Sequence, residues 1–251
     1  MPVYNFSMLK NYEITDAELG KIAINISKRA RRISFRGENG TITATIPHNY
    51  SGNIEYLQQL IDKHRAALKR LLNKSVSRHE NSRLYDGKRI EIVEGTLTLK
   101  ADPNIGRGRV RTCKTEKEII FLFHPNDLES ASFQQGLVRF IMRTLTMHYG
   151  AALRQMVEER ASLLGLKTKS VRIGRGQRIL GHCSRSGDIT ISAFTLLLPQ
   201  HLREYIICHE LAHLTHFNHS TSFHTLCNAY CNGNEAVWTR ELRKFAFPIS
   251  L

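Results

Sequence analysis

One segment, CHELAHLTHFNH at positions 208–219, restricts the local fold of this chain more than any other. It places four histidines and one glutamate among apolar residues. Apolar side chains at Ile206 and Leu211 flank His209, so the segment is predicted to be a helix that packs against a core. Polar groups on a half-buried helix are costly unless they have partners. A shared metal ion would be such a partner.

Helical spacing brings two of these histidines together. On an α-helix, His209 and His213 lie on one face, ~6 Å apart along the axis. Two imidazoles in that relation can bind one Zn²⁺ at about 2.1 Å each. Glu210 is displaced around the helix, where it is better placed to take a proton from a water molecule than to bind the ion. The spacing is that of H-E-x-x-H metallopeptidases and predicts Glu210 as the general base.

A catalytic zinc site needs a third protein ligand and keeps one position for water. Three later histidines are candidates: His216, His219 and His224. His216 shares the helix face but lies ~10 Å along the axis from His209, too far for one ion to reach both. His224 belongs to the next predicted helix, at 221–231, and the direction of its side chain is open.

His219 is the candidate that we favour. It follows Asn218, a residue that tolerates a left-handed turn, so the chain can reverse there. Ser220 or Thr221 can then cap the next helix. A reversal at this point would bring His219 back over His213. The predicted metal ligands are therefore His209, His213 and His219.

The remaining chain alternates strand and helix patterns, which indicates an α+β fold. Residues 22–46 are predicted to form strands around a turn at Glu38-Asn39-Gly40. Further strands are expected at 89–93, 97–101, 108–113, 118–123, 177–183 and 188–194. Helices are expected at 53–74, at 128–164 with Asp127 as its cap, from Pro199 through the histidine segment, and at 221–231. No internal repeat is recognisable.

The balance of elements changes near residue 126, from mostly strands to mostly helices. This change predicts two domains, a β-rich region with one helix at 1–125 and a second domain at 126–251. Strand 188–194 has the alternation of a half-buried strand and could pair with an extended peptide.

The net charge of +14 attracts polyanions but says nothing about fold. Lys28, Arg29, Arg31, Arg32 and Arg36 form one basic cluster, and residues 160–187 hold seven Lys or Arg and no acidic residue. Such runs are most often solvated faces, but they can also bind a polyanion. Nucleic acid is for that reason a candidate partner, and binding that weakens with salt would reveal it.

Several features indicate a cytoplasmic protein. No apolar run approaches the ~20 residues of a membrane span, and the first residues contain no apolar signal core. The five cysteines are an odd number without paired spacing, as is typical of reduced thiols.

The segment HELAHLTHFNHSTSF resembles the C-terminal signature of the YgjP-like metallopeptidases, relatives of the WLM and SprT zincins. The resemblance extends from about residue 20 to 245. KRARRISFR is similar to the opening of that family. GHCSRSGDITIS and LPQHLREYIICHELAH are similar to its hairpin and active-site helix. Two departures are Ile179-Leu180-Gly181-His182-Cys183, where the family usually has Arg-Trp-Gly-Ser-Cys, and His224, where it usually has tryptophan.

The resemblance implies a zincin-like C-terminal domain whose active-site helix lies beside a small antiparallel sheet. It implies a zinc-dependent endopeptidase that acts on peptides or proteins, with His209, His213 and His219 as ligands and Glu210 as base. The candidates for stabilising the oxyanion are His182, His224, Arg178 and Tyr230.

Two alternatives stay open. One is a basic nucleic-acid-binding or regulatory module with a structural zinc site, closed by Cys208, His216 or His224. The other is a zincin that hydrolyses something other than peptides.

Overall fold

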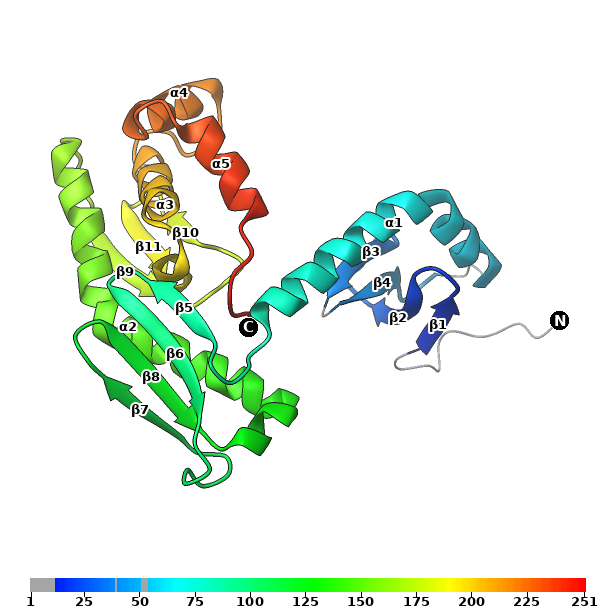
Figure 1. Cartoon of the computed structure of the whole chain (residues 1–251). Coiled ribbons are helices and arrows are strands. Elements are labelled where there is room, and N and C mark those ends of the chain that lie inside the picture. Colours follow the sequence, from blue (N-terminus) through cyan, green and yellow to red (C-terminus); the bar gives the residue numbers. More distant parts are fainter. Residues whose placement is uncertain (1–11, 39, 51–53) are drawn as a thin grey trace. The chain divides into compact units, whose positions relative to one another are not determined.

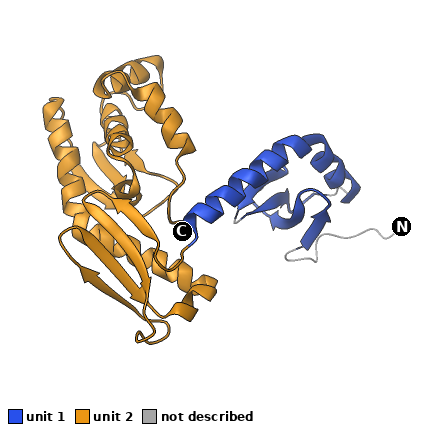
Figure 2. Ribbon diagram, in the orientation of Figure 1, with its two compact units in different colours: residues 1–83 blue, residues 84–251 orange. Residues whose placement is uncertain are grey.

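The computed structural model describes residues 12–38, 40–50 and 54–251 (Figure 1). The chain divides into two compact units, residues 1–83 and 84–251 (Figure 2). Each unit has its own hydrophobic core, built from residues of that unit alone. The change in element type near residue 126 falls inside unit 2. The division at 125/126 therefore stays a prediction, while the compact units divide at Arg83.

Unit 1 is a four-stranded sheet covered by one helix. Its elements are β1 (Tyr12–Asp16), β2 (Gly20–Ser27), β3 (Ser34–Glu38), β4 (Thr41–Pro47) and α1 (Ile54–Ser82). The strand order is β1-β2-β4-β3, with the central pair parallel and both outer strands antiparallel to their neighbours. The strands expected within 22–46 are confirmed. The turn expected at Glu38-Asn39-Gly40 includes Asn39, which lies outside the described residues.

Helix α1 packs on β3 and β4 and continues eight residues beyond the predicted end at 74. The close approach depends on Gly37, where a Cβ atom would lie 2.8 Å from the carbonyl oxygen of Leu71. Ser75 is buried on the same helix face, and its hydroxyl accepts a hydrogen bond from the Gly40 N–H at 3.0 Å. Contact with the sheet thus stabilises a helical turn whose sequence is largely polar.

A buried carboxylate joins the first hairpin to α1. Asp16 accepts the N–H groups of Glu18 and Leu19 at 2.9 Å each. It also takes two hydrogen bonds from the Arg65 guanidinium, at 2.8 and 3.0 Å. The Arg65 guanidinium holds the pKa of the Asp16 carboxyl far below its ordinary value.

Unit 2 begins with the same arrangement. Its elements are β5 (Arg89–Ile92), β6 (Gly95–Ala101), β7 (Val110–Lys114), β8 (Glu118–Phe123), the short 3₁₀ helix η2 (Pro125–Glu129) and α2 (Ala131–Leu163). The order β5-β6-β8-β7 again has a parallel central pair and antiparallel outer strands, followed by a long helix. The chain therefore contains a repeated topology, which its sequence does not reveal.

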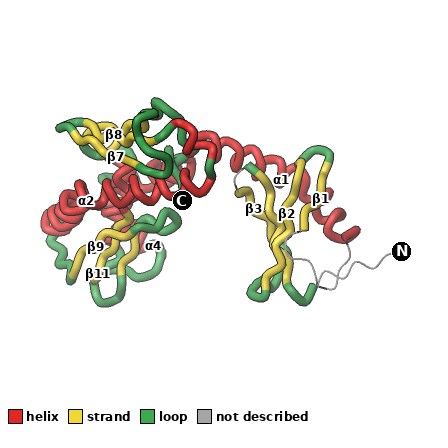
Figure 3. Tube along the Cα trace, turned by 90° about the horizontal axis from the view of Figure 1, so that it is seen from below, coloured by secondary structure: helices red, strands yellow, loops and turns green. Residues whose placement is uncertain are grey.

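The long helix of unit 2 is buried on two sides. α2 lies between the sheet of β7 and β8 and the sheet of β9 and β11 (Figure 3). Its N-cap is Ser130, whose hydroxyl accepts the Phe133 N–H at 3.3 Å, so Asp127 as the cap is wrong. The Asp127 carboxylate instead binds the loop before β7, through Arg107 and Gly108.

The last part of unit 2 holds the histidine segment. Its elements are β9 (Ser170–Gly174), β10 (Gly181–Cys183), β11 (Asp188–Ser192), the short 3₁₀ helix η3 (Ala193–Leu197), α3 (Gln200–Ala212), α4 (Thr221–Tyr230) and α5 (Glu235–Lys244). The sheet order is β10-β11-β9, antiparallel on one side of β11 and parallel on the other. The α+β class is confirmed, and the small sheet is mixed. Within the described ranges, no helix has both the length and the apolarity to cross a membrane.

Candidate metal centre

The helix that carries the site is held by a buried inner face. α3 begins after Pro199, where the fixed φ of proline suits a helix start. Its inner face carries the buried side chains of Ile206, Ile207 and Leu211, and the helix ends at His213, its C-cap. The chain then turns, and the hydroxyl of Ser220 caps α4 by accepting the Phe223 N–H at 3.3 Å. This turn returns the chain toward the end of α3.

The turn brings three imidazoles together. His209, His213 and His219 each offer one nitrogen, and these three atoms all lie within 4.8 Å of one another. The Nε2 atoms of His209 and His219 are 3.1 Å apart. Two nitrogens bound at about 2.1 Å to one tetrahedral ion lie roughly 3.4 Å apart. The spacing of the donor atoms therefore fits a single divalent ion, and imidazole is a donor that zinc favours.

A buried aromatic ring supports the three histidines. Phe223 is fully buried, and its ring centroid lies 5.0, 4.5 and 4.8 Å from those of His209, His213 and His219. It stacks on His213 with an angle of 29° between the planes. The ring is an apolar wall that limits how far each imidazole can rotate.

One ligand candidate is also oriented by a hydrogen bond. His213 Nδ1 lies 2.9 Å from the backbone carbonyl oxygen of His216. A carbonyl only accepts, so Nδ1 carries the proton and the Nε2 lone pair is left for a metal. His216 contributes here through its backbone. The ring of His209 is positioned by edge contacts with Tyr205 and Phe223, since its Nδ1 has no hydrogen-bond partner in the described part of the chain.

Burial keeps the imidazoles in the metal-binding form. Burial, with added repulsion from His213, His219 and His224, lowers the pKa of His209 to about 4. Burial also lowers the pKa of His213. Both rings are therefore neutral at pH 7, and a neutral imidazole is the form that binds metal.

Glu210 is 5% exposed and packs against the backbone of β10. A Cβ atom on Gly181 would lie 2.5 Å from the Glu210 Cγ and 2.7 Å from its Cδ, so the carboxyl occupies space that only glycine leaves free. Burial raises the pKa of Glu210 to about 7. A pKa near the working pH suits a group that both accepts and returns a proton.

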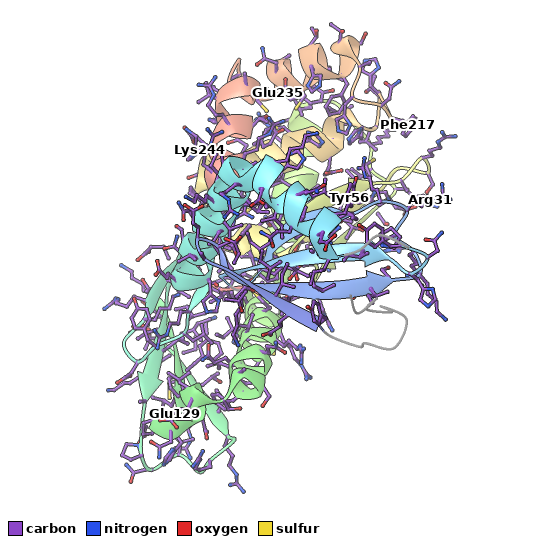
Figure 4. All side chains as sticks on the ribbon, turned by 90° about the vertical axis from the view of Figure 1, so that its right-hand side faces the viewer. Arg31, Tyr56, Glu129, Phe217, Glu235 and Lys244 are labelled. Atoms are coloured by element: carbon purple, nitrogen blue, oxygen red, sulfur yellow. The ribbon has the colours of Figure 1, made fainter. Side chains whose placement is uncertain are left out.

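His224 lies just outside the three-histidine cluster. Its Nδ1 is 2.6 Å from the Glu235 carboxylate, and its ring centroid is 6.2 Å from that of His219. Glu235, labelled in Figure 4, is largely buried at the start of α5. The pairing fixes the ring through one nitrogen and leaves the Nε2 atom available. No simple spacing in the sequence marks this pair.

The residues of a closed four-ligand site are not gathered. Among the described residues, the metal-competent cluster has three members, and Cys208, His216 and His224 are not among them. The Cys208 thiol is directed to the Tyr230 carbonyl at 3.4 Å. Within the described residues, the candidate site therefore consists of three imidazole ligands.

The free sheet edge near Glu210 belongs to β10. β11 is paired with β10 on one side and with β9 on the other, so the expectation that strand 188–194 accepts a peptide is wrong. β10 pairs with β11 alone, which leaves its other edge unpaired within the sheet. It carries Gly181, against which Glu210 packs, and the exposed His182.

Two imidazoles from one helical turn, a third from the turn that follows, and a buried carboxylate beside them are typical of an H-E-x-x-H metallohydrolase. Comparison with protein families agrees, since the family model described as "YgjP-like, metallopeptidase domain" matches residues 31–244. The chain belongs to the YgjP-like metallopeptidase family. It is therefore a metallopeptidase, which requires a metal and acts on peptides or proteins.

One solved structure is also similar, the metallopeptidase zymogen of Pyrococcus abyssi abylysin. The identity is 27%, over 39% of this chain and 99% of that one, and the TM-score is 0.33. No curated protein matches this chain.

Proposed function

We propose that this protein is a zinc-dependent endopeptidase in which His209, His213 and His219 bind the ion and Glu210 is the general base. The observation that carries the proposal is the convergence of three imidazole nitrogens within 4.8 Å. The Glu210 carboxyl is buried beside them, and within the described residues it forms no ion pair. Family membership supports peptide hydrolysis, and the three-imidazole donor set favours zinc over a hard cation.

When bound, a zinc ion would polarise the scissile carbonyl and lower the pKa of a water molecule toward neutrality. Glu210 would take the proton from that water as it attacks the carbonyl carbon. The protonated carboxyl would then return this proton to the leaving amine. Because Glu210 is shielded from solvent, the proton stays at the site between the two steps.

The free edge of β10 would hold the substrate as an added strand. An extended peptide beside Gly181 would form main-chain hydrogen bonds with β10 and present its carbonyl near Glu210. The exposed side chain of His182 would contact the neighbouring substrate residue.

Among the four candidates for stabilising the oxyanion, His224 has the best support. Its ring is held by the Glu235 carboxylate and neighbours His219. The other candidates have less support, because the Tyr230 hydroxyl is already hydrogen-bonded to Thr215 and Arg178 is exposed on the loop before β10. Because the Glu235 carboxylate accepts the hydrogen bond from Nδ1, His224 would donate from Nε2 to the carbonyl oxygen as the doubly protonated imidazolium, whose charge the carboxylate balances.

The test is a pair of substitutions with separate readouts. Glu210→Gln should retain zinc, measured by metal analysis, and lose peptide hydrolysis by about 10²-fold or more. His219→Ala should lose most of the zinc, while His216→Ala, in the same turn, should keep it. Full activity in Glu210→Gln would contradict the assignment of the base. Unchanged zinc in His219→Ala would contradict the ligand set and favour a structural site.

A further inference from the structure

The repeated topology allows the same corner to be compared in the two units. In each unit the central strands are parallel, so the loops that follow them leave at the same edge of the sheet. In unit 2 these are the loops after β6 and β8. In unit 1 they are the loops after β2 and β4. We name residues 28–33 with His48 and Asn49 the basic corner.

The corner of unit 2 contains its own anion. The Asp127 carboxylate, from the segment after β8, accepts the Gly108 N–H at 2.7 Å and the Arg107 Nε–H at 3.1 Å. Asp127 is 4% exposed, so it is an internal partner for the loop after β6. Asp102 begins that loop and accepts the N–H of Asn104 at 2.9 Å. Two carboxylates therefore accept hydrogen bonds from residues 104, 107 and 108 of this loop.

The basic corner of unit 1 is built differently. Ser27 is the last residue of β2, and its hydroxyl accepts the N–H of Arg29 at 3.2 Å. Residues 28–33 and 48–53 contain no aspartate or glutamate. In the described residues, no ion pair involves any of the cluster Lys28, Arg29, Arg31, Arg32 and Arg36.

A hollow lies between the two loops of the basic corner. It measures about 400 Å³ and is lined by Lys28, Ala30, Arg31, His48 and Asn49. Among the described residues, this lining includes cationic and amide side chains and no carboxylate. An external anion there would supply the kind of negative charge that Asp127 supplies in unit 2.

We propose that the basic corner binds the phosphate backbone of a single-stranded nucleic acid. The cations continue from the loop onto β3, an edge strand that carries Arg36, so they suit successive phosphates better than one small anion. Aromatic rings adjoin the corner: Tyr50 follows Asn49, and its ring lies 6.3 Å from that of Tyr56, which is 48% exposed. Arg31 and Tyr56 are both labelled in Figure 4. A basic surface beside an exposed aromatic ring is the usual platform for unpaired bases.

The test uses the full-length chain and a fluorescently labelled single-stranded oligonucleotide, with anisotropy measured over a series of salt concentrations. Binding should be strongest at low salt, and log K should fall linearly with log salt, by about 0.7 per phosphate contacted. Lys28→Glu with Arg31→Glu should weaken binding at least tenfold and make the slope shallower. Asn49→Asp should also weaken it, because it adds a carboxylate to the hollow.

The matched control is Lys63→Glu with Arg70→Glu, which makes the same charge change on exposed positions of α1. It should keep most of the affinity, and thermal unfolding should show that all variants fold. No binding at low salt would overturn the proposal, as would equal losses in corner and control variants. Equal affinity for heparin or anionic vesicles at the same salt would overturn the nucleic-acid assignment. Tyr56→Ala should weaken oligonucleotide binding without affecting heparin.

Discussion

At the scale of single residues, Gly181 shows how an absent side chain shapes the site. Its Cα–H face leaves room for the Glu210 carboxyl, which would otherwise overlap with a Cβ atom. The position of the proposed base is therefore set from the sheet as well as from the helix.

Gly181→Ala should displace the Glu210 carboxyl and lower kcat/KM on the order of 10²-fold, since a misplacement of about 1 Å has effects of that size. Zinc content should not change. The control is Gly176→Ala, five residues earlier, where a new Cβ atom would meet nothing within 4 Å. Equal activity in the two variants would show that Gly181 does not position the base.

Replacing His224 tests whether its imidazole stabilises charge on the carbonyl oxygen. His224→Phe should lower kcat by about 10²-fold, the effect of losing one oxyanion donor, with KM little changed. Glu235→Gln should reduce kcat less, because the ring would remain but lose its fixed orientation. Metal analysis of both variants separates this effect from loss of the ion, and an unaltered kcat in His224→Phe would refute the role.

Much of the candidate site follows from local sequence. His209, Glu210 and His213 lie within one helical turn, so helical periodicity alone predicts their relation. The return of His219 toward His213 could be predicted because Asn218, the residue before it, favours a turn. Phe223, Gly181 and the pair of His224 and Glu235 could not be predicted, because their contacts join elements whose relative placement the sequence does not specify.

At the scale of elements, the alternation of apolar and polar residues predicted which segments form strands, but not which strands pair with each other. The pattern of 188–194 is that of a half-buried strand, and a central strand between two partners has the same pattern as an edge. β9 was not predicted, because SVRIG is short and ends in glycine. α5 was missed as well, since its sequence EAVWTRELRK is mostly polar and few of its side chains are buried.

The ion pair of Asp16 and Arg65 predicts how the stability of unit 1 depends on pH. The carboxyl has a folded pKa below its ordinary value of 3.8, so the folded state favours the ionised form. This stabilisation is present above pH 3.8 and is lost as the pH falls toward the folded pKa. Asp16→Asn should lower the free energy of unfolding of unit 1 by about 2–3 kcal/mol at pH 7.

The measurement is urea unfolding of unit 1, monitored by hydrogen exchange of its backbone amides, at pH 7 and at pH 3. The difference between Asp16→Asn and the unaltered chain should shrink at the lower pH. Lys21→Gln is a suitable control, because its pairing with Glu13 is exposed and contributes little. A constant difference across this range would show that the carboxylate charge is not the source of the stabilisation.

At the scale of the whole molecule, one topology serves two different roles. The helix α1 buries a single stripe of side chains against its sheet, and its other positions are mostly polar. The helix α2 is buried by two sheets and carries apolar residues on both faces. Sequence comparison could not show the repeat, because the burial of the two helices differs and so does their pattern.

The two separate cores predict two unfolding transitions. Ile61→Ala, in the core of unit 1, should move one transition, with a loss of about 2–5 kcal/mol, and leave the other in place. A chelator should lower only the transition of unit 2, because a ligand stabilises the unit that binds it. Calorimetry with and without zinc measures both effects. One shared transition that responds to both changes would show that the units unfold together.

The unpaired edge of β10 is only three residues long. A partner that adds to it must present a stretch of backbone whose own amide groups are not already engaged in a helix or a sheet. Chain ends, interdomain tethers and polypeptides that have lost their native structure meet this condition, whereas the interior of an intact domain does not. The protein would thus select unfolded segments and interdomain linkers over folded domains by the conformation of their backbone, independently of their side chains.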